Sequence, residues 1–166
     1  MKKILSLLGT ITLIGTSTTS LVACNKPQEY TKEELTKLKE KNKINTKDGI
    51  LEWIAAQEIP FNQVDNKYYF VIWRNDNSGD WKISKFKNNI KLNVGETYTI
   101  NESLYLFNGN FAADLKIDLQ VILKNGVPLG WFFDRDSAFL KSVYRWNKDN
   151  EPNVDVENKL KSYLDL

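Results

Sequence analysis

The sequence predicts an α+β fold, an antiparallel β meander of about five strands flanked by N-terminal helices and a C-terminal helix. Three observations carry this prediction. Apolar and polar residues alternate through the middle of the chain, as in half-buried strands. Asn125-Gly126 is a strong signal for a two-residue hairpin turn. Helical spacing of apolar residues appears near both ends, and helices segregated in this way favour an antiparallel sheet.

The first expected helix covers residues 31–43. Thr31 and Glu34 form a capping box, and Tyr30 and Leu35 are spaced as a hydrophobic staple. Only Leu35 and Leu38 are apolar within the helix, so it has little to bury. We therefore expect a solvated stalk, with a helix that pairs with a partner as the alternative.

A second N-terminal helix is expected over residues 46–57. Ile50, Trp53, Ile54 and Gln57 follow helical spacing, and Thr46 is placed as the N-cap.

The strands are expected between residues 67 and 133. Residues 67–75 and 81–87 are rich in β-branched and aromatic residues and flank a turn sequence, which predicts a hairpin. Residues 95–107 supply another strand or a bent pair. Residues 115–123 alternate and return after Asn125-Gly126 through residues 127–133. The alternation predicts that the inward residues are Leu115, Ile117, Leu119, Val121 and Leu123, and that the outward ones are Lys116, Asp118 and Gln120.

The chain then has two further elements. Residues 136–146 fit either a helix or a strand, and the spacing of Phe139, Leu140, Val143 and Tyr144 favours the helix. Residues 154–166 predict a terminal helix with an apolar face made by Val156, Leu160, Tyr163 and Leu164.

The composition excludes several kinds of site. The chain has no His and one Cys, which rules out Ser-His-Asp and Cys-His catalysis, zinc sites of Cys and His, and internal disulfides. Carboxylate pairs remain, at Asp134 with Asp136 and at Asp76 with Asp80. Turn chemistry accounts for the second pair better than calcium binding does. We expect no metal, no cofactor and no enzyme, and we keep an anchored hydrolase that uses carboxylates as the alternative.

The one cysteine follows an N-terminal leader. Lys2 and Lys3 precede an apolar run of about a dozen residues, the length of a signal-peptide core rather than of a membrane span. Leu21, Val22, Ala23 and Cys24 then resemble a bacterial lipobox. Residues 1–26 as a whole resemble the leaders of mollicute surface lipoproteins of the spiralin type, and the rest of the chain does not. This resemblance implies cleavage between Ala23 and Cys24 and a diacylglyceryl group on the Cys24 thiol.

These boundaries divide the chain into three parts. Residues 1–23 are expected to be the signal peptide, 24–43 the lipidated tether and stalk, and 44–166 a single extracellular domain. Lys2 and Lys3 are two of the 23 basic residues, so the remaining 21 balance the 21 acidic residues. A neutral domain gives no reason to expect nucleic acid as a partner. The lysines at positions 82, 85, 87 and 91 are better explained as protection of an edge strand.

The candidate binding residues are aromatic. Three consecutive aromatic residues at positions 131–133 cannot all lie on one face of a strand, so at least one is expected at the surface. Packing in the core is the alternative for each aromatic residue. We expect a lipid-anchored protein on the extracellular face of the cell membrane that binds a protein or a glycan, with a structural coat role as a further alternative. The candidate contact residues are Trp131, Phe132, Phe133, Arg135 and Trp146.

Overall fold

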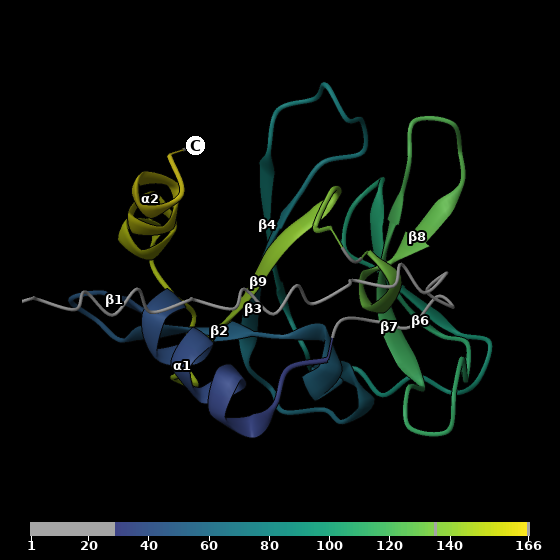
Figure 1. Cartoon of the computed structure of the whole chain (residues 1–166), viewed down its shortest axis with the longest axis horizontal. Coiled ribbons are helices and arrows are strands. Elements are labelled where there is room, and N and C mark those ends of the chain that lie inside the picture. The colour runs from purple at the N-terminus through teal and green to yellow at the C-terminus, as the bar shows by residue number, and fades with distance from the viewer. Residues whose placement is uncertain (1–28, 135, 166) are drawn as a thin grey trace, which may run out of the picture.

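The structure is a computed structural model that describes residues 29–134 and 136–165. The described residues form two antiparallel sheets with a helix packed on the larger one, which confirms the α+β class (Figure 1). They contain nine strands in two sheets, where the sequence predicted a single meander of about five.

The larger sheet has five strands in the order β1-β2-β9-β3-β4. The residue ranges of these strands are Ile44–Asn45 (β1), Ile50–Ile54 (β2), Tyr68–Trp73 (β3), Lys82–Lys87 (β4) and Leu140–Trp146 (β9). The predicted hairpin of β3 and β4 is confirmed, and β4 with its lysines is an edge strand.

The smaller sheet has four strands in the order β5-β6-β7-β8. Their ranges are Thr97–Thr99 (β5), Leu104–Asn108 (β6), Ile117–Ile122 (β7) and Pro128–Gly130 (β8). Residues 95–107 thus form the bent pair that the sequence allowed, and β7 and β8 form the predicted hairpin around Asn125-Gly126. Gly126 has a φ of 83°, which explains the glycine at this turn.

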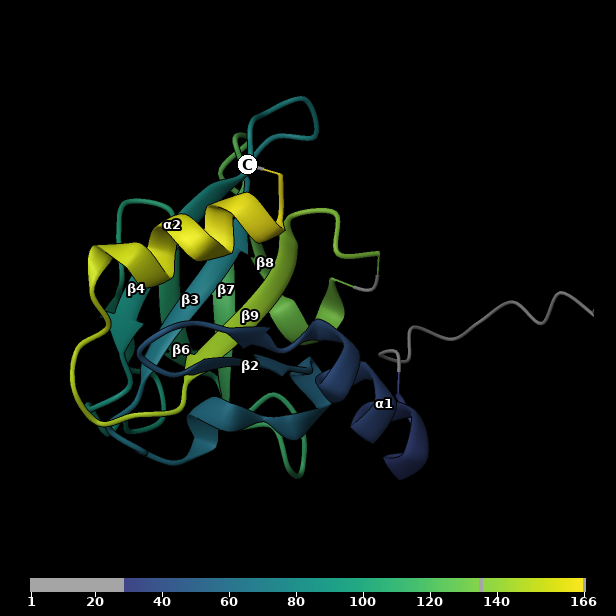
Figure 2. The same cartoon turned by 90° about the vertical axis from the view of Figure 1, so that its left-hand side faces the viewer.

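Two cores hold the layers together. The first lies between the two sheets and is built from alternate residues of β3, β6, β7 and β9, with Phe61, Phe86 and Trp131 around it. The second lies on the other face of the larger sheet, where the helix α2 (Val154–Tyr163) buries Val156 and Leu160 against Phe70, Tyr144 and Trp146. Figure 2 shows α2 crossing β3 and β9 on this face. The C-terminal helix predicted from the sequence is confirmed, with Asn153 as its N-cap.

The helix predicted over residues 46–57 is wrong. Residues 50–54 form β2, and Thr46 closes the turn before it by donating its hydroxyl hydrogen to the carbonyl of Gly49. Leu51 faces the α2 side and Ile54 faces the other sheet, so apolar residues appear on both faces of the strand. This double burial produces spacing that is indistinguishable from that of a helix.

The helix favoured over residues 136–146 is also wrong, for the same reason. Residues 140–146 form β9, which lies between β2 and β3 and is covered on both faces. A register shift opposite Ile72 and Trp73 places Leu140 and Val143 on the same side, which adds to the helical appearance of the sequence.

The first predicted helix is confirmed as α1 (Lys32–Asn42), with the expected capping box between Thr31 and Glu34. It contacts β2 instead of standing apart from the domain, although none of its side chains is fully buried. Tyr30 fixes its start, because its ring packs against Trp53 and its backbone exchanges two hydrogen bonds with the Gln57 side chain. Sequence reasoning gave no sign of this attachment. No helix among the described residues has the length and apolarity needed to span a membrane.

Candidate functional site

The aromatic segment at residues 131–133 forms a single turn of 3-10 helix, η3 (Trp131–Phe133), directly after β8. The turn separates the three rings. Trp131 is buried in the core between the sheets, Phe132 is partly buried, and Phe133 is 45% exposed. The expectation that at least one of the three aromatic residues reaches the surface is confirmed at Phe133.

Trp146 does not reach this surface. Trp146 is fully buried under α2, on the opposite side of the larger sheet, so its ring is not available to a partner. Arg135, Ala23 and Cys24 lie outside the described residues.

Four phenylalanines from three segments meet around η3. The rings of Phe107 on β6 and Phe111 in the loop after it have centroids 5.6 Å apart. Phe111 lies 6.4 Å from Phe133, and Phe133 lies 5.5 Å from Phe132, all with edge-to-face geometry. We call Phe107, Phe111, Phe132 and Phe133 the aromatic surface. The sequence did not indicate Phe107 or Phe111 as candidates, because only the fold brings the loop after β6 against η3.

Gly109 allows the loop to make this contact. A Cβ at this position would lie 2.6 Å from the Phe111 ring and 3.0 Å from the Phe107 ring. Because real Cβ atoms do not approach so closely, any side chain at position 109 would displace one of these two rings.

A buried acid lies beneath the aromatic surface. Asp118 on β7 is directly opposite Phe107 on β6 and is only 2% exposed. Asp118 and Gln120 face outward from the sheet, as predicted, but neither side chain reaches solvent. The turn η3 and the aromatic rings cover Asp118. Tyr105 covers Gln120 and donates a hydrogen bond to its side-chain oxygen at 2.8 Å.

Burial raises the pKa of Asp118 from 3.8 to about 7, against the opposing effect of hydrogen bonds from the backbone of Phe132 and Leu119. The backbone N–H of Phe132 donates to the two carboxylate oxygens over long distances of 3.3 and 3.4 Å. The buried carboxyl group is poorly solvated, and its long hydrogen bonds compensate only weakly for the lost solvation of the charged form. The neutral form is therefore favoured.

One acid of each carboxylate pair named from the sequence makes structural contacts. Asp134 accepts hydrogen bonds from the backbone N–H groups of Ala138, Phe139 and Leu140, so it holds the loop before β9, and Asp136 is exposed. Asp76 pairs with Lys124 at 2.9 Å and accepts from Ser78 within its turn, and these contacts lower its pKa to about 2. Among residues 29–134 and 136–165, no cluster of acidic, His or Cys side chains could hold a metal ion.

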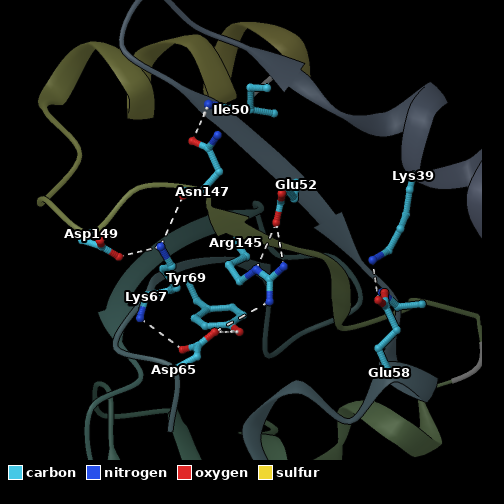
Figure 3. Close-up of polar contacts among 11 residues, drawn as sticks. Lys39, Ile50, Glu52, Glu58, Asp65, Lys67, Tyr69, Arg145, Asn147 and Asp149 are labelled. Carbon is cyan, nitrogen blue, oxygen red and sulfur yellow. Dashed lines mark hydrogen bonds and ion pairs between the residues drawn. The ribbon is translucent and has the colours of Figure 1, made fainter. Parts of the chain in front are cut away.

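A second polar site lies around Arg145 on β9 (Figure 3). Its guanidinium donates two hydrogen bonds to Glu52 on β2, at 3.0 and 2.8 Å, and lies 3.8 Å from Asp65. The Tyr69 hydroxyl donates a hydrogen bond to Asp65 at 2.8 Å. Burial of the Tyr69 side chain and this hydrogen bond raise the pKa of Tyr69. Arg145 borders a groove of about 430 Å³ between α1 and β2. Two carboxylates balance the charge of Arg145, and the two lysines of the groove, Lys39 and Lys43, pair with Glu58 and Glu40.

A small cavity of about 70 Å³ connects the aromatic segment with the start of α1. Tyr30 and Trp53 line one side of it, and Trp131, Phe132, Asp134 and Lys141 line the other. Phe132, one of the four rings of the aromatic surface, is therefore next to the place where the described chain begins.

Comparisons with known proteins give one match and no family. No family model matches the chain, and no solved structure matches it. The chain is 30% identical over 95 residues to the uncharacterized protein ORF1 of Spiroplasma virus SpV1-R8A2 B. The match covers 57% of this chain and 8% of the viral protein, so the chain spans a small part of that relative. The comparison links the sequence to spiroplasma and assigns it no activity.

Proposed function

We propose that this chain is a lipid-anchored protein of the cell surface whose exterior domain makes a binding contact through the aromatic surface and performs no catalysis. The anchor is supported by the lipobox ending at Cys24 and by a leader like those of mollicute lipoproteins. The match to a Spiroplasma virus protein is consistent with a mollicute origin of the sequence.

The observation that carries the binding role is the network of four phenylalanine rings that includes the exposed ring of Phe133. These rings lie outside both cores. Exposed aromatic residues that already pack against one another are held in place, so they lose little conformational entropy when a partner covers them. A neutral domain adds little electrostatic steering, so the contact should depend weakly on salt.

The anchor is tested by Cys24→Ala, with Thr18→Ala as a matched control that changes the leader outside the lipobox. Without the thiol, neither acylation nor cleavage is expected, so the variant should accumulate as an uncleaved precursor. The control should be processed like the wild type. Mass spectrometry and detergent partitioning measure both outcomes. A Cys24→Ala chain that is still cleaved and still partitions into detergent would refute the anchor.

The contact is tested by Phe133→Ala, with Val127→Ala as the control. Like Phe133, Val127 is exposed (53%), but it lies in the β7–β8 turn and is not part of the aromatic surface. In a retention assay, solubilised envelope components are passed over the immobilised chain. Loss of the Phe133 ring should weaken their binding free energy by about 2 kcal/mol. The control should change nothing. Equal retention by both variants, or loss of retention at physiological salt alone, would argue against the aromatic surface.

A further inference from the structure

The aromatic surface lies at the end of the domain from which the anchor would extend. Tyr30 lines the same cavity as Trp131 and Phe132, so the start of the described chain and η3 are neighbours. In Figure 1 the coloured chain begins between α1 and the turn that follows β8.

The chain between the lipid and this point is short. Six residue steps separate Cys24 from Tyr30, and a chain of that length reaches no further than about 22 Å. Tyr30 itself is held to the domain by Trp53 and Gln57. A lipid on Cys24 would therefore keep the η3 end of the domain within a short distance of the bilayer.

We propose that the partner of the aromatic surface is the interfacial region of the bilayer that holds the anchor. This inference rests on the proposed lipid attachment at Cys24. Phenylalanine rings enter the boundary between headgroups and acyl chains, and a tether of this length holds them at a high effective concentration there. A contact that is weak in free solution is then well populated. A protein partner arriving from outside would have to enter the narrow space between the domain and the membrane.

The charges beside the aromatic surface fit a neutral interface. Asp114 and Lys116, both exposed, bring opposite signs to the loop after β6 that also carries Phe111. Anionic lipid is recognised by clusters of basic residues. The described residues of this loop form no such cluster. Zwitterionic lipid is therefore sufficient, and the contact should be apolar in character.

The test uses the full lipidated chain in phosphatidylcholine vesicles, with and without lipid that carries a nitroxide quencher near the headgroup. Because Cys24 is acylated, a fluorophore can be attached at a single new thiol. Ala112→Cys places it beside Phe111 at an exposed position, and Val127→Cys places it in the β7–β8 turn as the matched control. We expect the quencher to act strongly at position 112 and weakly at position 127.

Phe133→Ala in the Ala112→Cys chain then tests whether the aromatic surface causes this proximity. Removing a ring that is 45% exposed should lower the ratio of docked to undocked chains about tenfold, and Val127→Ala should leave it unchanged. Equal quenching at positions 112 and 127 would overturn the inference while leaving the anchor intact. Phe133-dependent capture of an envelope protein together with equal quenching would assign the surface to that protein. A wild-type chain that carries no lipid would overturn both the anchor and this inference.

Discussion

The carboxylate of Asp118 lies against the Cα of Gly130, so closely that a Cβ at position 130 would be 2.2 Å from Oδ2. The two residues belong to neighbouring strands, and Gly130 is the last residue before η3. Its φ of −81° is open to any residue, so the glycine is required by the neighbouring acid and not by the backbone. This close approach lets η3 fold over Asp118 and carry Phe132 and Phe133 to the aromatic surface.

Gly130→Ala is therefore expected to destabilise the domain by about 1–3 kcal/mol, the usual cost of forcing extra atoms into a packed site. Urea unfolding measures the change. In an Asp118→Ala background, the same substitution should cost much less, because the clashing carboxylate is gone. Equal costs in the two backgrounds would show that position 130 is sensitive for another reason.

Asp118→Asn should stabilise the domain at alkaline pH. The pKa of Asp118 is raised to about 7 in the folded chain, from 3.8, so the folded state binds more protons than the unfolded state between these values. The contribution of this group to the free energy of unfolding is fully present below pH 4 and is lost as the pH rises toward 7. The loss reaches about 4 kcal/mol at most, and a neutral amide avoids it.

Urea unfolding of the wild type and of Asp118→Asn at pH 5 and pH 8 tests this prediction. The variant should gain relative to the wild type as the pH rises. A constant difference between the two proteins across this range would show that Asp118 titrates normally.

Removal of α1 should weaken the domain only slightly. A chain that begins at Ile44 loses the Tyr30–Trp53 ring pair and the Lys39–Glu58 ion pair, but no fully buried side chain. Such contacts are worth about 1–2 kcal/mol together. Cooperative unfolding in urea should remain. A loss well above 3 kcal/mol would place α1 inside the folding unit and move the predicted boundary at residue 44 towards the N-terminus.

The pair of Arg145 and Glu52 should act as a structural contact between β9 and β2. Both side chains are more than a third exposed, so solvent screens the pair. A double-mutant cycle with Arg145→Ala and Glu52→Ala should give a coupling of about 0.5–1 kcal/mol that decreases at high salt. A gain in thermal stability of the wild type on adding phosphate, absent in Arg145→Ala, would instead indicate an anion site in the groove beside α1.

Local sequence patterns correctly identified the elements that bury a single face or that depend on turn and cap residues. The capping box at Thr31 and Glu34, the turn at Asn125-Gly126 and the apolar face of α2 each depend on residues close in sequence. The α+β class followed from these patterns. The exposure of at least one ring among residues 131–133 followed from the fact that three adjacent rings cannot share one face of a strand, but the sequence did not show which ring it is.

β2 and β9 could not be identified in this way. Each strand contributes apolar residues to both cores, one between the sheets and one beneath α2. Apolar and polar residues therefore do not alternate along these strands. The outward assignment of Asp118 was correct for the strand but wrong for its exposure, because η3 covers it.

The sequence by itself determined the composition, the resemblance of residues 21–24 to a lipobox and the short-range elements, since each depends on neighbouring residues or on residue types. Tertiary structure decided which aromatic residues are available. It buried Trp131 and Trp146 in two separate cores, and it brought Phe111, which packs on Phe107, against Phe133. The physical reason is that exposure depends on which segments cover a residue, and those segments are distant in the sequence.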